Sequence, residues 1–290
     1  MKIPVSLIIF AAIVLGLLFP KGVMLKDFTF PLLFVLMYFS ILQIKLNPKK
    51  FFRKEIMFWA LVNVIVLPLF AYFIGSSLSE YLLLGVVVAA LAPTAVNSPF
   101  FVNLIDGDKE MSVSISAIAN LTSIFYIPFV LFLLFGLRLA IPYQQILTNI
   151  FGLVFIPLFL VVLTRKLLKK TYATIINYSN DIIPIVLFLI LWIIFSSSSS
   201  QILSFSREVL SIIPIILLVS ILGFFSGFIV VKDKKLRRTL SICFGYKNQT
   251  LMLGIIYNIN PLAAIPPTIY LVVHQILNGL MVWLFEKKKI

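Results

Sequence analysis

The sequence has few charged residues. Only 12% of its 290 residues are Asp, Glu, Lys or Arg, whereas 61% are hydrophobic and the mean hydropathy is +1.13. Soluble domains carry about 25% charged and about 45–50% apolar residues. A water-soluble enzyme, a secreted disulfide scaffold and a disordered chain would all need more charge than this. These classes are excluded, and a membrane-embedded protein remains.

Residue types that support catalysis or bind metals are also scarce. The single Cys excludes an intramolecular disulfide, and one Cys with one His argues against a zinc or iron–sulfur site. No Walker-type phosphate-binding loop is present, which excludes an ATP-driven pump within this chain. All ten acidic residues lie in predicted loops or at the ends of predicted spans, so paired catalytic acids inside the membrane are absent. We therefore expect neither an enzyme nor a resident cofactor.

Long apolar runs, in contrast, are abundant. A helix needs about 20 mostly apolar residues to cross the hydrocarbon core, and lipid requires every backbone polar group to be paired within the protein. Ten runs meet or nearly meet this length, which predicts an all-α membrane protein of ten transmembrane helices. The expected spans are residues 3–20, 28–46, 56–75, 82–104, 111–136, 145–164, 181–198, 209–231, 240–258 and 264–285.

The net charge of +14 is distributed unevenly over the predicted loops. With ten spans, 19 of the 24 basic residues fall on the side of the N-terminus, and only Lys21, Lys26, Arg138 and Arg207 fall on the other. The positive-inside rule then places both termini in the cytoplasm and predicts a multi-pass protein of the cytoplasmic membrane. These basic loops are interpreted as contacts with anionic lipid, not nucleic acid. Lys247 alone falls inside an apolar run.

Ten spans divide into two sets of five, residues 1–140 and 141–290. An odd number of spans per half makes the second half enter the membrane from the opposite side, which is the inverted-repeat plan of many secondary transporters. Pro31 and Pro184 lie near equivalent starts of the second span in each half. This similarity is weak in such apolar sequence.

Helix breakers and polar residues interrupt the fourth span of each half. The interruptions are APTAVNSP at residues 92–99 and FGYKNQT at residues 244–250. A break leaves free backbone N–H and C=O groups at membrane depth, where they can hold ions or substrate. A single break would be interpreted as a proline kink with interhelical hydrogen bonds, whereas two breaks at matching positions indicate a transporter's binding site.

Several segments resemble the bile acid:sodium symporter family. They are FSILQIKLNPKKF, LAPTAVNSPFFVNLIDGDKEMSVSISAIANLTS, LSICFGYKNQTLMLGI and LVVHQILNG. The resemblance implies a panel of helices 1, 2, 6 and 7 beside a core of helices 3–5 and 8–10. In that core, broken helices 4 and 9 cross, and organic anions move by alternating access. The auxin efflux carriers share this architecture.

The resemblance also implies a first sodium site at Ser98, Pro99, Ser112, Ser116 and Cys243. The family pattern has Asn at position 99 and Glu at position 243. A hard cation prefers oxygen ligands, so a proline ring and a thiol are poor replacements. A residual Na+ site at Ser98, Ser112 and Ser116 stays as an alternative, and no other metal site is expected.

A second sodium site is implied at Asn63, the backbone near Cys243, and Lys247, where the family has Gln. Two unit charges about 4 Å apart at an effective dielectric near 20 repel by roughly 4 kcal/mol, so an ammonium group repels Na+ and can occupy its place. We interpret Lys247 as a tethered cation that holds the crossover together, bonded to the serines, Asn63 and helix C-terminal carbonyls. It could also attract an anionic substrate, or couple transport to H+ by losing its proton. The alternative is that Lys247 snorkels to the cytoplasmic face.

The expected substrate-binding side chains are Asn97, Asn248, Gln249, His274 and Gln275. Asn248 matches a family position beside the substrate cavity, and His274 and Gln275 occupy the family's polar pair in the last span. By residue type alone, an interhelical hydrogen bond is the simpler role for His274.

The sequence thus predicts a secondary transporter of a small organic anion that is not classically coupled to Na+. A Na+:organic anion symporter is the second interpretation, and a membrane enzyme or scaffold is the alternative from another class.

Overall fold

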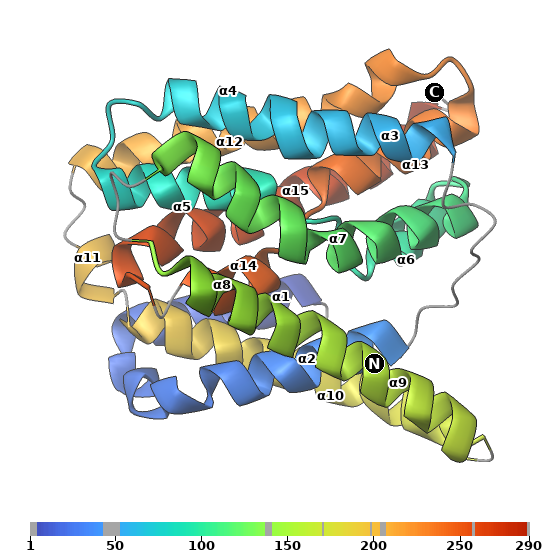
Figure 1. Cartoon of the computed structure of the whole chain (residues 1–290), viewed down its shortest axis with the longest axis horizontal. Helices are drawn as coiled ribbons and strands as arrows, with labels where there is room; N and C mark the ends of the chain where they lie inside the picture. Colours follow the sequence, from blue (N-terminus) through green and yellow to red (C-terminus); the bar gives the residue numbers. More distant parts are fainter. Residues whose placement is uncertain are drawn as a thin grey trace.

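The computed structural model describes residues 5–42, 53–136, 141–169, 171–197, 199–203, 207–256 and 259–288. Helices make up almost all of this described part, and it contains no β-strand (Figure 1). Arg138 and most of the segment FSILQIKLNPKKF, residues 43–51, lie outside it. The helices are α1 Val5–Leu18, η1 Pro20–Phe28, α2 Thr29–Leu42, α3 Lys54–Ala60, η3 Leu61–Val66, α4 Leu67–Ile74, α5 Glu80–Leu91, α6 Ser98–Leu104, α7 Lys109–Phe135, α8 Tyr143–Ile150, η4 Phe151–Phe155, α9 Ile156–Leu167, α10 Tyr172–Ser197, α11 Ser199–Leu203, α12 Arg207–Val230, α13 Lys234–Gly245, α14 Gln249–Ile256, η5 Pro261–Ala264 and α15 Ile265–Lys288.

Six helical stretches are long and apolar enough to cross a membrane, which confirms an all-helical membrane protein but not the full count of ten spans. α10 adds a seventh if its two parts, which are bent by 41° between Ser179 and Asp181, count as one span. Pro184 lies in this helix and cannot donate a hydrogen bond to the carbonyl four residues earlier, which explains the bend. The six stretches are Pro20–Leu42, Lys54–Ile74, Lys109–Phe135, Tyr143–Leu167, Leu210–Ile229 and Leu262–Phe285.

The expected fourth and ninth spans are each broken into two helices. α5 and α6 are separated by residues 92–97, and α13 and α14 by residues 246–248. The breaks therefore lie where the sequence places its helix breakers and polar residues. Neither span continues as one helix through the molecule.

Two spans contain a π-helical turn just before a proline. η3 precedes Pro68 and η4 precedes Pro157. In η3 the N–H of Leu67 bonds to the carbonyl of Val62, five residues back. Proline lacks the N–H that would bond to the carbonyl four residues earlier, and the helix widens by a π-helical turn beside it. The widened turn changes the direction of the side chains that precede the proline. Asn63 lies in this turn and is 1% exposed.

Buried apolar side chains form two clusters on either side of the breaks. The first cluster joins α1, α2 and α8–α10 to α14 and to parts of α5, α7 and α15, and α10 packs against α1, η1 and α2. The second joins α3–α7 to α12, α13 and α15, and α12 packs against α13 and α15. In Figure 1, α1, α2, α9 and α10 lie in the lower layer and α3, α4, α12 and α13 in the upper layer.

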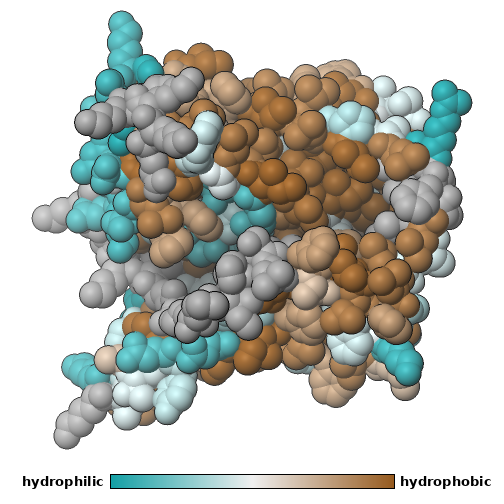
Figure 2. Space-filling view, turned by 180° about the vertical axis from the view of Figure 1, so that it is seen from behind, coloured by the Kyte–Doolittle hydropathy of each residue, from teal (hydrophilic) through white to brown (hydrophobic). Residues whose placement is uncertain are grey.

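The outer surface is apolar around the middle of the molecule. Figure 2 shows a brown belt between hydrophilic ends. Ile229, Phe125 and Phe73 are 87%, 71% and 69% exposed. Such a belt matches the hydrocarbon core of a bilayer, since large apolar side chains are stable there without protein contacts.

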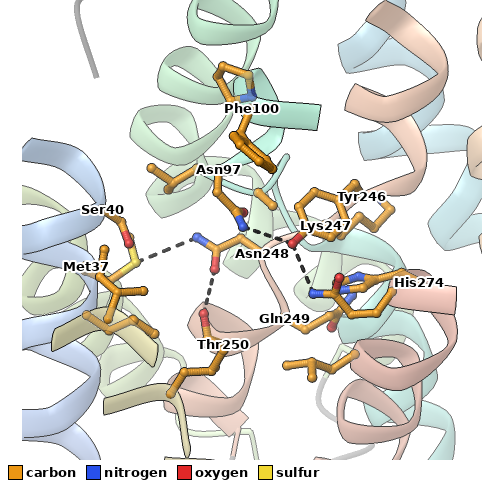
Figure 3. Close-up of a pocket in the computed structure, with 18 of the residues that line it drawn as sticks. Met37, Ser40, Asn97, Phe100, Tyr246, Lys247, Asn248, Gln249, Thr250 and His274 are labelled. Atoms are coloured by element: carbon orange, nitrogen blue, oxygen red, sulfur yellow. Dashed lines mark hydrogen bonds between the residues drawn. The ribbon is translucent and has the colours of Figure 1, made fainter. Parts of the chain in front are cut away.

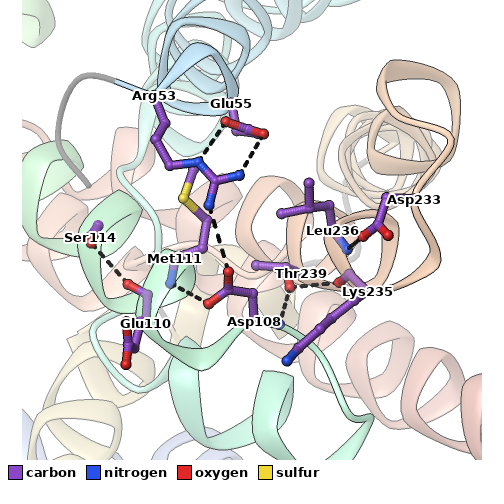
Figure 4. Close-up of polar contacts among 10 residues, drawn as sticks. All are labelled: Arg53, Glu55, Asp108, Glu110, Met111, Ser114, Asp233, Lys235, Leu236 and Thr239. Carbon is purple, nitrogen blue, oxygen red and sulfur yellow. Dashed lines mark hydrogen bonds and ion pairs between the residues drawn. The ribbon is translucent and has the colours of Figure 1, made fainter. Parts of the chain in front are cut away.

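A polar cluster ties three elements together at one end of the molecule (Figure 4). Asp108 caps α7 by accepting a 2.9 Å bond from Met111 N, and its own N–H donates to Thr239 Oγ1 at 2.7 Å. Arg53 pairs with Glu55 at 2.9 Å and with Asp108 at 3.7 Å. The Gly-Asp turn before α7 is thus fixed to the N-terminal end of α3 and to α13.

Gly227 allows α12 and α13 to approach each other closely. A Cβ atom at Gly227 would overlap the backbone of Ser241 and Leu240, and backbone cannot move aside easily. We expect Gly227→Ala to lower the free energy of unfolding by about 1–3 kcal/mol, the cost of overpacking.

Gly279→Ala is the matched control, because no heavy atom lies within 4 Å of a Cβ at that exposed helical position. Denaturant unfolding in detergent measures both variants. Equal stability of the two would contradict this packing.

Candidate functional site

The two helix breaks cross each other as short extended segments. Thr94 and Lys247 face each other in an isolated antiparallel pairing. Two backbone hydrogen bonds flank this pair, from Ala95 N to Tyr246 O at 3.0 Å and from Asn248 N to Pro93 O at 2.7 Å. Exchanging the two segments exchanges these two bonds, so the crossing has a local two-fold symmetry.

Lys247 lies in this crossing and is 1% exposed. Its Nζ donates to Asn63 Oδ1 at 2.5 Å, to the Ala90 carbonyl at 2.8 Å and to the Ala92 carbonyl at 3.3 Å. The two carbonyls belong to the C-terminal end of α5, where the helix dipole favours a positive charge. The buried interpretation of Lys247 is therefore confirmed, and snorkelling is wrong. No serine is among its bonds in the described structure, contrary to the expectation.

Thr94 makes the symmetry-related contact from the other break. Its hydroxyl donates to the Cys243 carbonyl at 2.6 Å, near the C-terminal end of α13. Lys247 follows Thr94 by 153 positions, and Cys243 follows Ala90 by the same number. Each crossing residue thus satisfies a carbonyl of the other broken helix.

Further amide side chains complete this hydrogen bonding. Gln249 Nε2 donates to the Ala89 carbonyl at 2.9 Å. Asn120 Nδ2 donates to the Thr94 carbonyl at 2.9 Å, and its Oδ1 accepts from Asn248 Nδ2 at the same distance. The crossing is therefore held from η3, α7 and both broken helices.

The residues of the implied first sodium site bond to one another. Ser98 and Ser112 hydroxyls are 3.0 Å apart, and Cys243 Sγ lies 3.3 Å from Ser112 Oγ. Ser116 donates to the Ala95 carbonyl at 3.2 Å instead. Pro99 lies in the first turn of α6, on the wall of a cavity. In the described part of the chain, no cluster of three or more His, Cys, Asp or Glu could hold a metal ion.

A cavity of about 380 Å³ lies beside the crossing, between the two apolar clusters (Figure 3). One wall is apolar and comes from α2 and α10; the opposite wall carries amides and hydroxyls. All five expected substrate-binding residues line it: Asn97, Asn248, Gln249, His274 and Gln275. Among the described residues, the lining contains no Asp or Glu, and its cations are Lys247 and the exposed Lys109.

Sequence reasoning did not assign Tyr246 and Lys109, which line the cavity, or Thr94, which holds the crossing, to this site. Asn120 was expected to join helices by hydrogen bonds, and it does so at the crossing. Thr94 lies within the first break and Tyr246 directly precedes Lys247, so their positions were visible in the sequence. The direction of their side chains was not, because irregular backbone has no period from which a face can be inferred.

Removing the Thr94 hydroxyl tests the crossing itself. Thr94→Val keeps the shape of the side chain but leaves the buried Cys243 carbonyl without its donor, so we expect a loss of about 1–3 kcal/mol in the free energy of unfolding. Thr122→Val is the control, because the exposed Thr122 hydroxyl bonds only to carbonyls within its own helix. Denaturant unfolding of both variants in detergent should separate them. A loss at Thr122 as large as that at Thr94 would refute the special role of the crossing.

Comparison with protein families matches residues 30–208 to the model of the Sodium Bile acid symporter family. No individual curated protein matches the chain. The matched range contains Asn63 and the first break, and it ends before the second break with Lys247. Membership in a transporter family and several long apolar helices together imply a multi-pass membrane protein. Because the match covers more than half of its length, the chain belongs to the sodium bile acid symporter family.

Proposed function

We propose that this protein is a secondary transporter that moves a small organic anion across the cytoplasmic membrane by alternating access. We further propose that Lys247, not Na+, supplies the positive charge at the crossing of the broken helices. The observation that carries the proposal is the buried ammonium group of Lys247, bonded to Asn63 Oδ1 and two carbonyls of α5.

The oxygens around Lys247 are of the kind that would ligate Na+. Amide and backbone carbonyl oxygens are hard ligands that suit a hard cation. An ammonium group already bonded to these oxygens competes with Na+ for them and repels it. Because the lysine is tethered to the chain, its amino group stays at the crossing throughout a transport cycle.

Helix bounds support the inverted repeat of residues 1–140 and 141–290. Thr94 and Lys247 are 153 positions apart in the sequence. Adding the same 153 positions to Lys54–Ile74 gives a range that begins where α12 begins. It likewise places α5 on α13 to within one residue, and Pro31 on Pro184. Contacts between helices exchange in the same way, since α1 packs on α10 as α2 packs on α9, and α5 packs on α15 as α13 packs on α7.

Packing between helices supports a panel of helices 1, 2, 6 and 7 that moves against a core of helices 3–5 and 8–10, since α10 packs against α1, η1 and α2 whereas α12 packs against α13 and α15. The cavity lies between the clusters and is lined by both. Rocking of one repeat-derived body against another around a site near the middle of the membrane is the usual basis of alternating access.

The lining of the cavity supports an organic anion as the cargo. An apolar wall that includes Met37 and Leu187 faces amides such as Asn97 and Gln275. With Lys109 and Lys247 and no carboxylate in the lining, the field in the cavity attracts negative charge. The same lack of carboxylates opposes a membrane enzyme that uses paired acids.

Lys247→Gln tests how transport is energised. We expect proteoliposomes with the unaltered protein to take up an organic anion, for instance 2-naphthalenesulfonate, equally well in Na+ and in choline buffers. Lys247→Gln restores the family residue and leaves the oxygens of Asn63, Ala90 and Ala92 without their cation. Its uptake should fall about tenfold or more in choline and recover in Na+. Uptake measured from pH 5.5 to 8.5, a range of about three pH units, tests whether Lys247 exchanges its proton during transport.

Lys109→Gln is the charge-matched control, since Lys109 also lines the cavity but is exposed. It should acquire no dependence on Na+. Uptake by the unaltered protein that requires a Na+ gradient would favour the symporter with a residual site at Ser98, Ser112 and Ser116. An unchanged response of Lys247→Gln to both pH and Na+ would remove Lys247 from coupling. If no anion of a broad panel is taken up or exchanged under any gradient, transport itself is refuted.

A further inference from the structure

Tyr246 lies at the centre of the polar wall of the cavity. Its side chain is only 3% exposed, yet it lines the cavity. Its ring packs edge-on against Phe101 with centroids 5.0 Å apart and lies 4.7 Å from the His274 ring. The phenol is therefore held in one place by its neighbours from α6 and α15.

Two amide groups donate hydrogen bonds to the Tyr246 hydroxyl. Asn97 Nδ2 lies 3.0 Å and Gln275 Nε2 3.1 Å from this oxygen, and both bonds converge on it in Figure 3. A carboxamide nitrogen donates and does not accept. The phenol oxygen is therefore the acceptor in both bonds, and its lone pairs are occupied.

The hydroxyl proton of Tyr246 is the part of this group that is still available for a hydrogen bond to a ligand. A hydroxyl that accepts two hydrogen bonds can form only one more, by donating its own proton. No acceptor for that proton is bonded to Tyr246 in the described part of the chain. Two donors acting on the oxygen also polarise the O–H bond and strengthen it as a donor. A polar group of this kind, buried in a cavity wall, matches an acceptor-only ligand atom.

We propose that Tyr246 is the residue that binds the anionic group of the substrate, with Asn97 and Gln275 as positioning residues that orient its hydroxyl. This inference rests on the proposed function and adds to it a specific donor. The ligand class is an organic anion whose carboxylate or sulfonate oxygen accepts the Tyr246 proton while its apolar body lies against α2 and α10. Lys247 does not make this contact, because its Nζ is bonded to Asn63 and α5.

Binding of 2-naphthalenesulfonate and of its neutral sulfonamide to the purified full-length protein, measured by calorimetry, tests the proposal. Tyr246→Phe removes only the hydroxyl and keeps the ring. We expect its affinity for the sulfonate to fall about tenfold, the loss typical of one hydrogen bond to a charged acceptor. Its affinity for the sulfonamide should change less than about threefold, since a neutral ligand loses a weaker bond.

Tyr270→Phe is the matched control. Tyr270 is also buried and also packs on the His274 ring, but its hydroxyl donates to the Gly245 carbonyl at 3.3 Å and it does not line the cavity. This variant should bind the sulfonate as the unaltered protein does. Gln275→Glu is a second test that needs no loss of the ring: its carboxylate would accept the Tyr246 proton, and sulfonate binding should fall while sulfonamide binding persists.

Three outcomes would overturn the assignment of Tyr246. They are unchanged sulfonate affinity in Tyr246→Phe, an equal loss for both ligands, and an equal loss in Tyr270→Phe. Sulfonate that fails to bind even the unaltered protein would also overturn it. Uptake in proteoliposomes separates the two levels: if the unaltered protein transports the sulfonate and Tyr246→Phe binds it normally, only the role of Tyr246 fails. If no anion is transported or exchanged at all, the proposed function fails.

Discussion

Carbonyl groups at the ends of two helices that stop inside the protein impose the main constraint on this structure. α5 and α13 both end at the crossing, where no continuing helix satisfies their last carbonyls. The chain solves this with one side chain from each break: Lys247 bonds to the carbonyls of Ala90 and Ala92, and the Thr94 hydroxyl bonds to that of Cys243. Without such donors the two breaks could not remain buried.

The difference between the two donors connects the fold to the proposed transport. Thr94 is neutral, whereas Lys247 brings a positive charge into a region that holds no carboxylate among the cavity-lining residues. The resemblance of this chain to its family implies a Na+ ion at this place. Here a tethered ammonium group keeps the crossing assembled whether or not Na+ is present. Ser98, Ser112 and Cys243 bond directly to one another, so the other implied ion position also holds together through protein groups alone. Under the proposed function, a carrier built in this way would reorient without binding a sodium ion.

Much of this arrangement could be predicted from the sequence, because hydropathy and helix breakers are local signals. The two breaks were placed correctly, and the five expected substrate residues line one cavity. The bonding partners were less accessible: the serines were expected around Lys247 but bond elsewhere, and Tyr246 was missed. Side-chain direction in irregular backbone depends on contacts with distant segments, as the π-helical turn that presents Asn63 also shows. No sequence period records such contacts.

Direct measurement of ²²Na+ binding, by scintillation proximity on the purified protein, tests the central claim that Lys247 takes the place of a sodium ion. Binding should be measured against choline at constant ionic strength, for the unaltered protein and for Lys247→Gln. The account predicts no saturable ²²Na+ binding to the unaltered protein and one saturable site in Lys247→Gln. Saturable binding to the unaltered protein that Lys247→Gln leaves unchanged would contradict it.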